Sequence, residues 1–282
     1  MKSIRIIPRL DIKGPNLVKG IHLEGLRVLG KPQEFAEFYY EQGADELMFM
    51  DVVASLYERN SLKEIITATA RKIFIPLTVG GGLRTLQDMK EVLRAGADKV
   101  SLNTAAIKNP DIIRDASLEF GASTIVVTIE AIQGNDGKYL AYTDNGRDYT
   151  GIEVLEWAQR VESLGAGELV ITSVDKEGTG EGYDIELTKM IAQNVSIPVI
   201  AHGGAGKITN IHDVIKKGRA DAITLASMLH YQFITERPSA INDRDEGNTE
   251  FLKSKKDFTK CDKVTISEIK KGLQNCGVSC RV

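Results

Sequence analysis

Four short motifs occur twice in the chain, and the two copies are always 122 or 123 residues apart. The pairs are GADE at 43–46 with GAGE at 165–168, IP at 75–76 with IP at 197–198, VGGG at 79–82 with HGGA at 202–205, and ADKV at 97–100 with ADAI at 220–223. A nearly constant offset over four sites predicts a fold made of two similar halves.

Short apolar runs alternate with amphipathic stretches in both halves. The runs expected to be strands are residues 4–10, 47–50, 73–79, 99–102, 124–129, 169–172, 199–201 and 222–225. Strands this apolar are typical of a parallel sheet that helices cover on both faces. Eight of them, alternating with helical patterns, predict an α/β fold, a (β/α)8 TIM barrel with an internal (β/α)4 half-barrel repeat.

The domain prediction is a single barrel over residues 1–282, with half-barrels at about 1–120 and 121–282. Residues 238–260 break the pattern, because they are polar and charged, and they are expected to form an insertion between the eighth strand and a last helix at 266–273. A length of 282 residues with 42% hydrophobic content is normal for one such barrel.

Composition excludes several classes of protein. A net charge of −3 argues against a nucleic-acid-binding surface, and no apolar run approaches the roughly 18 residues of a membrane span. The N-terminus lacks the apolar core of a signal peptide. The three cysteines have neither zinc-site spacing nor a histidine cluster, so we interpret them as reduced thiols of a cytoplasmic protein without a metal site.

Barrel enzymes bind their substrates at the carboxyl ends of the strands, and two glycine-rich loops follow expected strands there. Glycine lets the backbone approach a phosphate, and the next helix N-terminus offers free N–H groups. The predicted phosphate-binding residues are Gly81, Gly82, Asn103 and Thr104 in one half and Gly203, Gly204, Ala226 and Ser227 in the other. The alternative is that the glycines serve only tight turns. Their symmetry favours two phosphates on opposite sides of the mouth.

Carboxylates are the candidate acids and bases. Asp11 ends the first expected strand, and Glu130 ends the fifth, its equivalent in the other half. Such a pair across a barrel mouth suits general acid/base catalysis, although a carboxylate at a strand end also commonly caps a loop. Five further residues after strands two and six are expected to bind substrate or order loops: Asp51, Thr172, Asp175, Glu177 and Gly178.

Of three other side chains, Lys19 and His202 each have two possible interpretations. Lys19 lies in a long loop at 14–30 and is either a cation on a flexible lid or a solvated lysine. His202 either titrates near neutral pH or packs as a neutral imidazole, and His230 is expected to be structural.

At the opposite end, four charged residues begin expected strands: Arg5, Glu46, Lys99 and Glu168. They form either a stabilising ring or the lining of a pore through the barrel.

Together these residues resemble a known family, the cyclase subunit of imidazole glycerol phosphate synthase, over nearly the whole chain apart from about 238–260. The motifs that carry the resemblance lie at residues 6–8, 10–11, 18–20, 43–47, 76–82, 95–101 and 200–206. The resemblance implies a lyase of histidine biosynthesis that uses ammonia to convert a bisphosphate ribulosyl-formimino ribonucleotide into imidazole glycerol phosphate and aminoimidazole carboxamide ribotide.

The resemblance also implies roles for residues. Asp11 is the general acid/base, and Lys19 belongs to a mobile loop. Ammonia comes from a glutaminase subunit docked at the barrel bottom, where Asp98 lies in the interface. It enters through a gate made of Arg5, Glu46, Lys99 and Glu168. No metal or organic cofactor is implied.

Four positions depart from the family pattern. Glu130 and Glu177 stand where aspartate is usual, Arg9 replaces a small cysteine, and His202 replaces a serine. Strand alternation points Arg9 and Asp11 to the same side, where the cation is expected to weaken Asp11 as a base.

These departures cluster at the substrate end and keep alternatives open. One is a cyclase-like, ammonia-channelling subunit of an amidotransferase for surface-polysaccharide sugars. Another is a non-catalytic activator of the glutaminase. The third is the related single-chain sugar isomerase, which would not need the gate.

Overall fold

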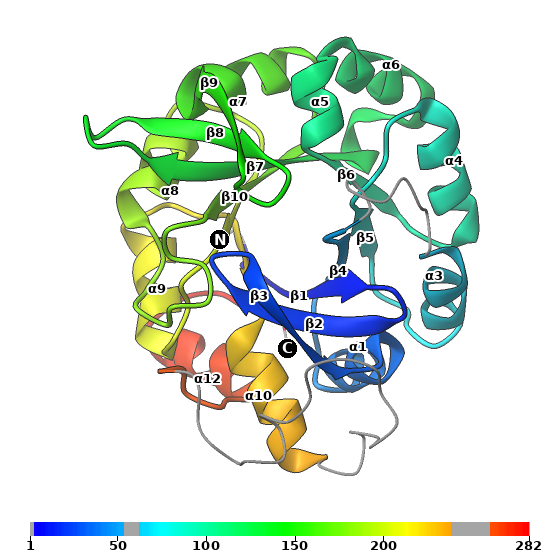
Figure 1. The fold of residues 1–282 in the computed structure, drawn as a ribbon. Coiled ribbons are helices and arrows are strands. Elements are labelled where there is room, and N and C mark those ends of the chain that lie inside the picture. Colours follow the sequence, from blue (N-terminus) through cyan, green and yellow to red (C-terminus); the bar gives the residue numbers. More distant parts are fainter. Residues whose placement is uncertain (1–2, 54–61, 238–259, 282) are drawn as a thin grey trace.

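The computed structural model describes residues 3–53, 62–237 and 260–281, and in these the barrel is closed. Eight parallel strands pair in the order β1, β4, β5, β6, β7, β10, β11 and β12, and β12 pairs with β1 (Figure 1). Their bounds are β1 Arg5–Lys13, β4 Leu47–Asp51, β5 Leu77–Gly80, β6 Lys99–Leu102, β7 Ile125–Gln133, β10 Glu168–Ser173, β11 Val199–His202 and β12 Ala222–Leu225. The predicted TIM barrel is confirmed.

Helices form an outer ring around the strands (Figure 1). They are α1 Pro32–Glu41, α3 Lys63–Ala70, α4 Leu86–Ala95, α5 Thr104–Lys108, α6 Asp111–Phe120, α7 Val154–Ser163, α8 Ile185–Ala192, α9 Ile208–Lys216, α10 Ser227–Glu236 and α12 Ile266–Asn275, with a short 3-10 turn at Ala122–Thr124. None of the helices among the described residues is both long and apolar enough to cross a bilayer.

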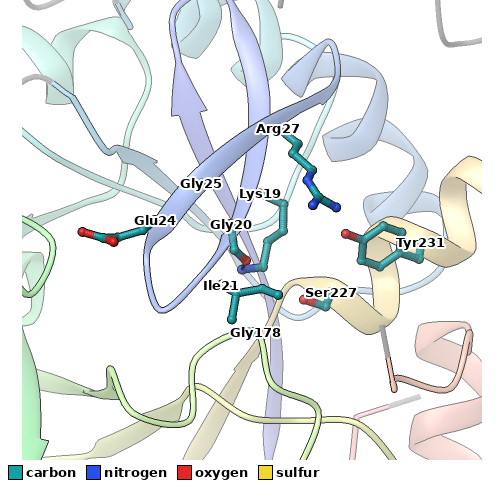
Figure 2. A pocket seen from close by; sticks show the side chains of 9 residues that line it. All are labelled: Lys19, Gly20, Ile21, Glu24, Gly25, Arg27, Gly178, Ser227 and Tyr231. Atoms are coloured by element: carbon teal, nitrogen blue, oxygen red, sulfur yellow. Dashed lines mark hydrogen bonds between the residues drawn. The ribbon is translucent and has the colours of Figure 1, made fainter. Parts of the chain in front are cut away.

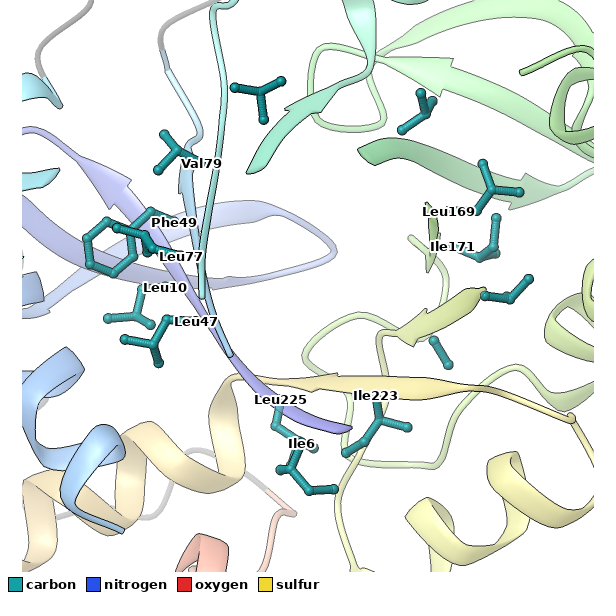
Figure 3. Packing of buried hydrophobic residues seen from close by; sticks show 14 of the residues in the cluster. Ile6, Leu10, Leu47, Phe49, Leu77, Val79, Leu169, Ile171, Ile223 and Leu225 are labelled. Carbon is teal, nitrogen blue, oxygen red and sulfur yellow. The ribbon is translucent and has the colours of Figure 1, made fainter. Parts of the chain in front are cut away.

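Strand alternation divides the core into two layers. Outward side chains such as Leu10, Leu47 and Phe49 point from the strands toward the helices and are fully buried (Figure 3). Inward side chains form a separate apolar cluster inside the barrel, made of Ile7, Met48, Val126, Val170, Ile200 and Ala222. Burial of both faces explains why the strands are apolar throughout.

Two β-hairpins extend the barrel beyond the carboxyl ends of β1 and β7 (Figure 1). The first is β2 Asn16–Ile21 with β3 Glu24–Gly30, and the second is β8 Tyr139–Thr143 with β9 Asp148–Glu153. Most of the segment predicted as a loop at 14–30 is therefore strand, because its backbone groups pair as a ladder, and its role as a lid stays a prediction. The hairpin places Lys19 on a strand.

Among the strand starts, that of β5 differs most from the prediction. The strand expected at 73–79 begins only at Leu77, and Phe74 is 81% exposed. The apolar residues before Pro76 belong to the turn that leads into β5. The predicted insertion at 238–260 falls almost wholly outside the described residues, and the half-barrel repeat stays a prediction.

The last described helix, α12, contacts the amino-terminal end of the barrel through a buried ion pair. Lys270 of α12 donates to Asp45 Oδ1 at 2.8 Å and to the Gly43 carbonyl at 2.7 Å. The second oxygen of Asp45 accepts the Ile6 N–H at 2.8 Å. Both charged side chains are buried, so each depends on the other for compensation.

We therefore expect Lys270→Ala to lower the free energy of unfolding by about 3 kcal/mol, since it leaves the Asp45 carboxylate buried without its cation. Urea denaturation of the purified chain measures this. Lys271→Ala, at an exposed position of the same helix, is the control and should change stability by less than about 0.5 kcal/mol. Equal denaturation midpoints for the two variants would contradict the assignment.

Candidate active site

The four charged residues predicted at the strand starts do meet, and they form a closed ring. Arg5 lies 2.6 Å from Glu46 and 2.8 Å from Glu168, and Lys99 lies 3.2 Å and 3.1 Å from the same two carboxylates. Each cation therefore bridges both anions, so the signs alternate around the ring. All four side chains are mostly buried.

An apolar layer follows the ring toward the carboxyl ends of the strands. Ile7, Met48 and Val170 each lie two residues beyond a member of the ring, so alternation points them into the same interior. They pack with Val126, Ile200 and Ala222. The interior thus passes from charged to apolar before it reaches polar groups.

The first glycine loop borders a cavity of about 400 Å³ at the carboxyl end of the barrel. Gly81 has a φ of +96°, and a Cβ there would lie 2.2 Å from the Asp51 carbonyl oxygen, so only glycine fits. The predicted residues that line this cavity are Asp51, Gly81, Gly82, Asn103, Thr104 and Glu130.

The second glycine loop borders a much smaller cavity, of about 20 Å³. It is lined by Lys19, Glu177, Gly178, His202, Gly203, Gly204, Ala226 and Ser227, among others. A neighbouring cavity of about 280 Å³ shares Lys19, Gly178 and Ser227. In Figure 2, Arg27 extends from the first hairpin toward Tyr231 of α10, whereas the Lys19 ammonium turns toward the Gly20 carbonyl oxygen, to which it donates at 2.7 Å.

The two loops have nearly the same backbone conformation. Gly81 and Gly203 have φ values of +96° and +97°. The next strand-to-helix turns along the chain, after β6 and β12, match as well: Asn103 before α5 has φ −135° and ψ −85°, and Ala226 before α10 has φ −129° and ψ −79°. Both loops lie at the same end of the barrel and each leads to a helix N-terminus, as two anion-binding sites require.

The two candidate acid/base carboxylates have different surroundings. Asp11 Oδ1 accepts a hydrogen bond of 2.8 Å from Arg9 Nε, and both side chains are buried. Arg9 and Asp11 therefore share one side of β1, as alternation predicted. Glu130 Oε2 accepts the Gly146 N–H at 2.8 Å.

Burial raises the pKa of Glu130 to about 7. The Gly146 N–H, the Arg9 cation and the Asn103 amide each lower it, and the Asp144 carboxylate raises it further. A carboxyl group with a pKa near 7 exchanges its proton readily at neutral pH, which suits general acid/base chemistry.

Lys19 is not a solvated lysine, because it is buried and its ammonium pairs with Glu177. The loop after β10, which contains Glu177, also binds the tip of the first hairpin. Two backbone N–H groups of the tip donate to Glu177. Leu23 N–H donates to Glu177 Oε2 at 2.9 Å, and His22 N–H donates to the Glu177 carbonyl at 3.0 Å. The first hairpin therefore lies closed over the mouth.

The remaining predicted residues take separate places. Asp51, which lines the larger cavity, also accepts the Val53 N–H. Asp175 is exposed, accepts the Gln133 N–H and lies outside both glycine-loop cavities. Asp98 is exposed and caps the start of β5. His230 is structural as predicted, since it is buried and bonds Tyr39 Oη at 2.6 Å.

Some residues of the site were not predicted. Asp144 and Asn145 line the larger cavity, and Gly146 donates to Glu130. All three have positive φ values in the turn between β8 and β9. An Asn-Gly dipeptide between two strand-like runs is a strong hairpin signal, so this turn was predictable from the sequence.

Comparison with known proteins decides the family. A family model described as histidine biosynthesis protein matches residues 5–235. The imidazole glycerol phosphate synthase subunit HisF of Legionella pneumophila is 56% identical over 208 residues, which is 74% of this chain and 98% of the relative. This chain belongs to the HisF family. The HisF subunits of Alkaliphilus metalliredigens and Methanococcus vannielii are each 46% identical, over 83% and 82% of this chain and 93% of each relative.

Within this HisF-family barrel, His202 takes the neutral one of its two predicted states. Burial, the Arg9 cation and the Lys19 cation hold the pKa of His202 well below 6.5. An imidazolium at this position would be buried beside two other cations. His202 is therefore a neutral group beside the second glycine loop.

The raised pKa of Glu130 predicts a pH-dependent effect of Glu130→Gln on stability. The unfolded carboxyl ionises near 4.5, whereas the buried one ionises near 7. Wild-type stability therefore falls as pH rises from 4.5 to 7, whereas the amide does not titrate. The variant should match the wild type near pH 4.5 and exceed it by about 3 kcal/mol at pH 8.

Denaturant unfolding at several pH values checks this. Glu156→Gln, at an exposed position of α7, is the control and should show no such trend. A stability difference for Glu130→Gln that does not change between pH 4.5 and 8 would disprove the raised pKa.

Proposed function

We propose that this HisF-family chain is the ammonia-dependent cyclase of histidine biosynthesis. It converts the bisphosphate ribulosyl-formimino ribonucleotide into imidazole glycerol phosphate and aminoimidazole carboxamide ribotide. The observation that carries the proposal is a pair of similar sites, here called the glycine cradles. One combines the Gly81–Gly82 loop with the start of α5, and the other combines the Gly203–Gly204 loop with the start of α10. They share one barrel end with Asp11 and Glu130 and have nearly identical backbone geometry. A substrate with two phosphates fits this arrangement.

The two cradles are proposed to position the substrate by its ends. Backbone N–H groups at Gly81 and Gly82 and the start of α5 hold one phosphate. Gly203, Gly204 and the start of α10 hold the other. Binding at both ends fixes the reacting centre between them, which removes much of the entropic cost of the reaction.

Asp11 and Glu130 are proposed to move protons at that centre. Ammonia that replaces a carbonyl oxygen to form an imine must lose two protons, and the oxygen must gain two protons to leave as water. Glu130, with a pKa of about 7, is able to give and take protons at neutral pH. Asp11, held through one oxygen by Arg9, keeps the other oxygen for the substrate.

The charged ring and the apolar layer support delivery of ammonia from below. We propose that a glutaminase subunit docks at the amino-terminal end, where Asp98 and Phe74 are exposed. Ammonia would pass Arg5, Glu46, Lys99 and Glu168 and then cross the apolar layer. A dry path keeps ammonia unprotonated and nucleophilic. With a phosphorylated metabolite as substrate, the proposal places the protein in the cytoplasm and needs no cofactor.

The second candidate is an ammonia-channelling subunit for amidation of surface-polysaccharide sugars. Its support is the set of unusual residues at the substrate end, Arg9, Glu130, Glu177 and His202. The comparisons do not favour it, since relatives at 46–56% identity are named as subunits of imidazole glycerol phosphate synthase.

The test is turnover of the bisphosphate ribonucleotide by the purified chain with an ammonium salt as the nitrogen source. We expect wild-type turnover, and a fall in kcat of about 1,000-fold for Asp11→Asn, because the variant lacks its acid/base group. The KM of the variant should stay within about twofold, since the change leaves both cradles intact.

Asp136→Asn, at an exposed position in the turn between β7 and β8, is the matched control and should retain full activity. No turnover by a correctly folded wild-type chain would refute the proposed function. Full turnover by Asp11→Asn would remove Asp11 from the mechanism.

A further inference from the structure

A buried arginine connects the reaction centre to the second cradle. Arg9 is 2% exposed and lies inside the barrel. Its Nε donates to Asp11 Oδ1 at 2.8 Å, and its Nη1 lies 3.2 Å from His202 Nδ1. One rigid guanidinium thus contacts a proposed catalytic carboxylate on β1 and a histidine at the end of β11.

The contact with Arg9 determines which ring nitrogen of His202 carries the proton. A guanidinium has only donors and stays protonated in proteins, so His202 Nδ1 must accept. Burial and the nearby Arg9 and Lys19 cations keep the ring neutral. A neutral imidazole whose Nδ1 holds a lone pair carries its single proton on Nε2.

The protonated nitrogen has no acceptor among the described residues. Within residues 3–53, 62–237 and 260–281, both hydrogen-bond contacts of His202 use Nδ1, with Arg9 at 3.2 Å and Thr172 Oγ1 at 3.1 Å. His202 also lines the small cavity beside Gly203, Gly204 and Ser227. A neutral N–H at a cavity wall, with no acceptor among the described residues, is available to donate to a bound ligand.

The charges around this cavity explain the need for such a donor. Lys19 lines it but is paired with Glu177, so the Lys19 cation is largely compensated. A phosphate there gains from a further donor that is fixed in direction, and a neutral N–H provides this without adding charge next to Arg9 and Lys19.

We propose that His202 binds the phosphate of the second cradle through Nε2–H, and that Arg9 is a positioning residue that holds both this tautomer and the Asp11 carboxylate. The inference rests on the proposed function and deepens it. It assigns a further phosphate ligand to the same site and couples that ligand to the reaction centre.

Binding of inorganic phosphate, measured by titration calorimetry, tests the His202 assignment without any turnover. His202→Leu removes the donor and should raise the phosphate Kd about tenfold, the scale of one hydrogen bond to a charged group. His202→Gln keeps a neutral side-chain donor and should stay within about threefold of the wild type. His212→Leu, in α9 away from the cradles, is the control. An unchanged Kd for His202→Leu overturns the assignment.

Steady-state kinetics with the bisphosphate ribonucleotide test the role of Arg9. Arg9→Met should lower kcat, because Asp11 loses its anchor, and should raise KM, because His202 loses its fixed tautomer. In a His202→Leu background, Arg9→Met should lower kcat by the same factor but no longer raise KM. Independent, additive effects on KM would overturn the coupling.

Two further results keep the tests separable. If Arg9→Met fails to fold by circular dichroism, Arg9→Lys takes its place, since lysine keeps a cation but cannot donate in two directions from one planar group. If the wild type shows no turnover, the proposed function fails, but the calorimetric comparison of wild type, His202→Leu and His202→Gln still decides whether His202 is a phosphate ligand.

Discussion

The two-residue period of a β-strand organises this molecule along the barrel axis. On β1, every second side chain points inward, which places Arg5, Ile7, Arg9 and Asp11 one above another. These four residues belong in turn to a charged ring, an apolar layer, a guanidinium level and an acid/base level. Closure of the barrel brings side chains from other strands into the charged ring and the apolar layer. A shift of β1 by one residue would therefore destroy all four levels at once.

Much of this architecture follows from the sequence, because the signals it rests on are local. Apolar runs located all eight strands, and the two glycine-rich motifs predicted two loops at the carboxyl ends of the strands. The four charged residues of the ring were predictable as well, since each stands at the start of an apolar strand and therefore lies at the amino-terminal end of the barrel. The repeat gave the strongest support, because motifs in one half lent weight to their copies in the other.

Other features depend on contacts that no local pattern encodes. The hairpin at 16–30 has charged and glycine residues typical of a loop, and it becomes strand only because it pairs with β1 and closes on Glu177. Arg9 looked like a disturbance beside Asp11, whereas the fold gives its guanidinium a second contact, at His202, which lies 193 residues away in the chain. Residues 75–76 are as apolar as a strand, but Pro76 precedes β5 and only the sheet register shows where pairing starts.

The closed first hairpin has a consequence for the catalytic cycle. Its tip is secured to the loop after β10 by the Lys19–Glu177 ion pair and by the His22 and Leu23 N–H groups. A Cβ at Gly178 would lie 2.9 Å from the Gly20 carbonyl oxygen, so the two segments are in close backbone contact. A ligand that leaves the second glycine loop on the side of the hairpin requires these bonds to break, and the rate of that opening then limits how fast the ligand is released.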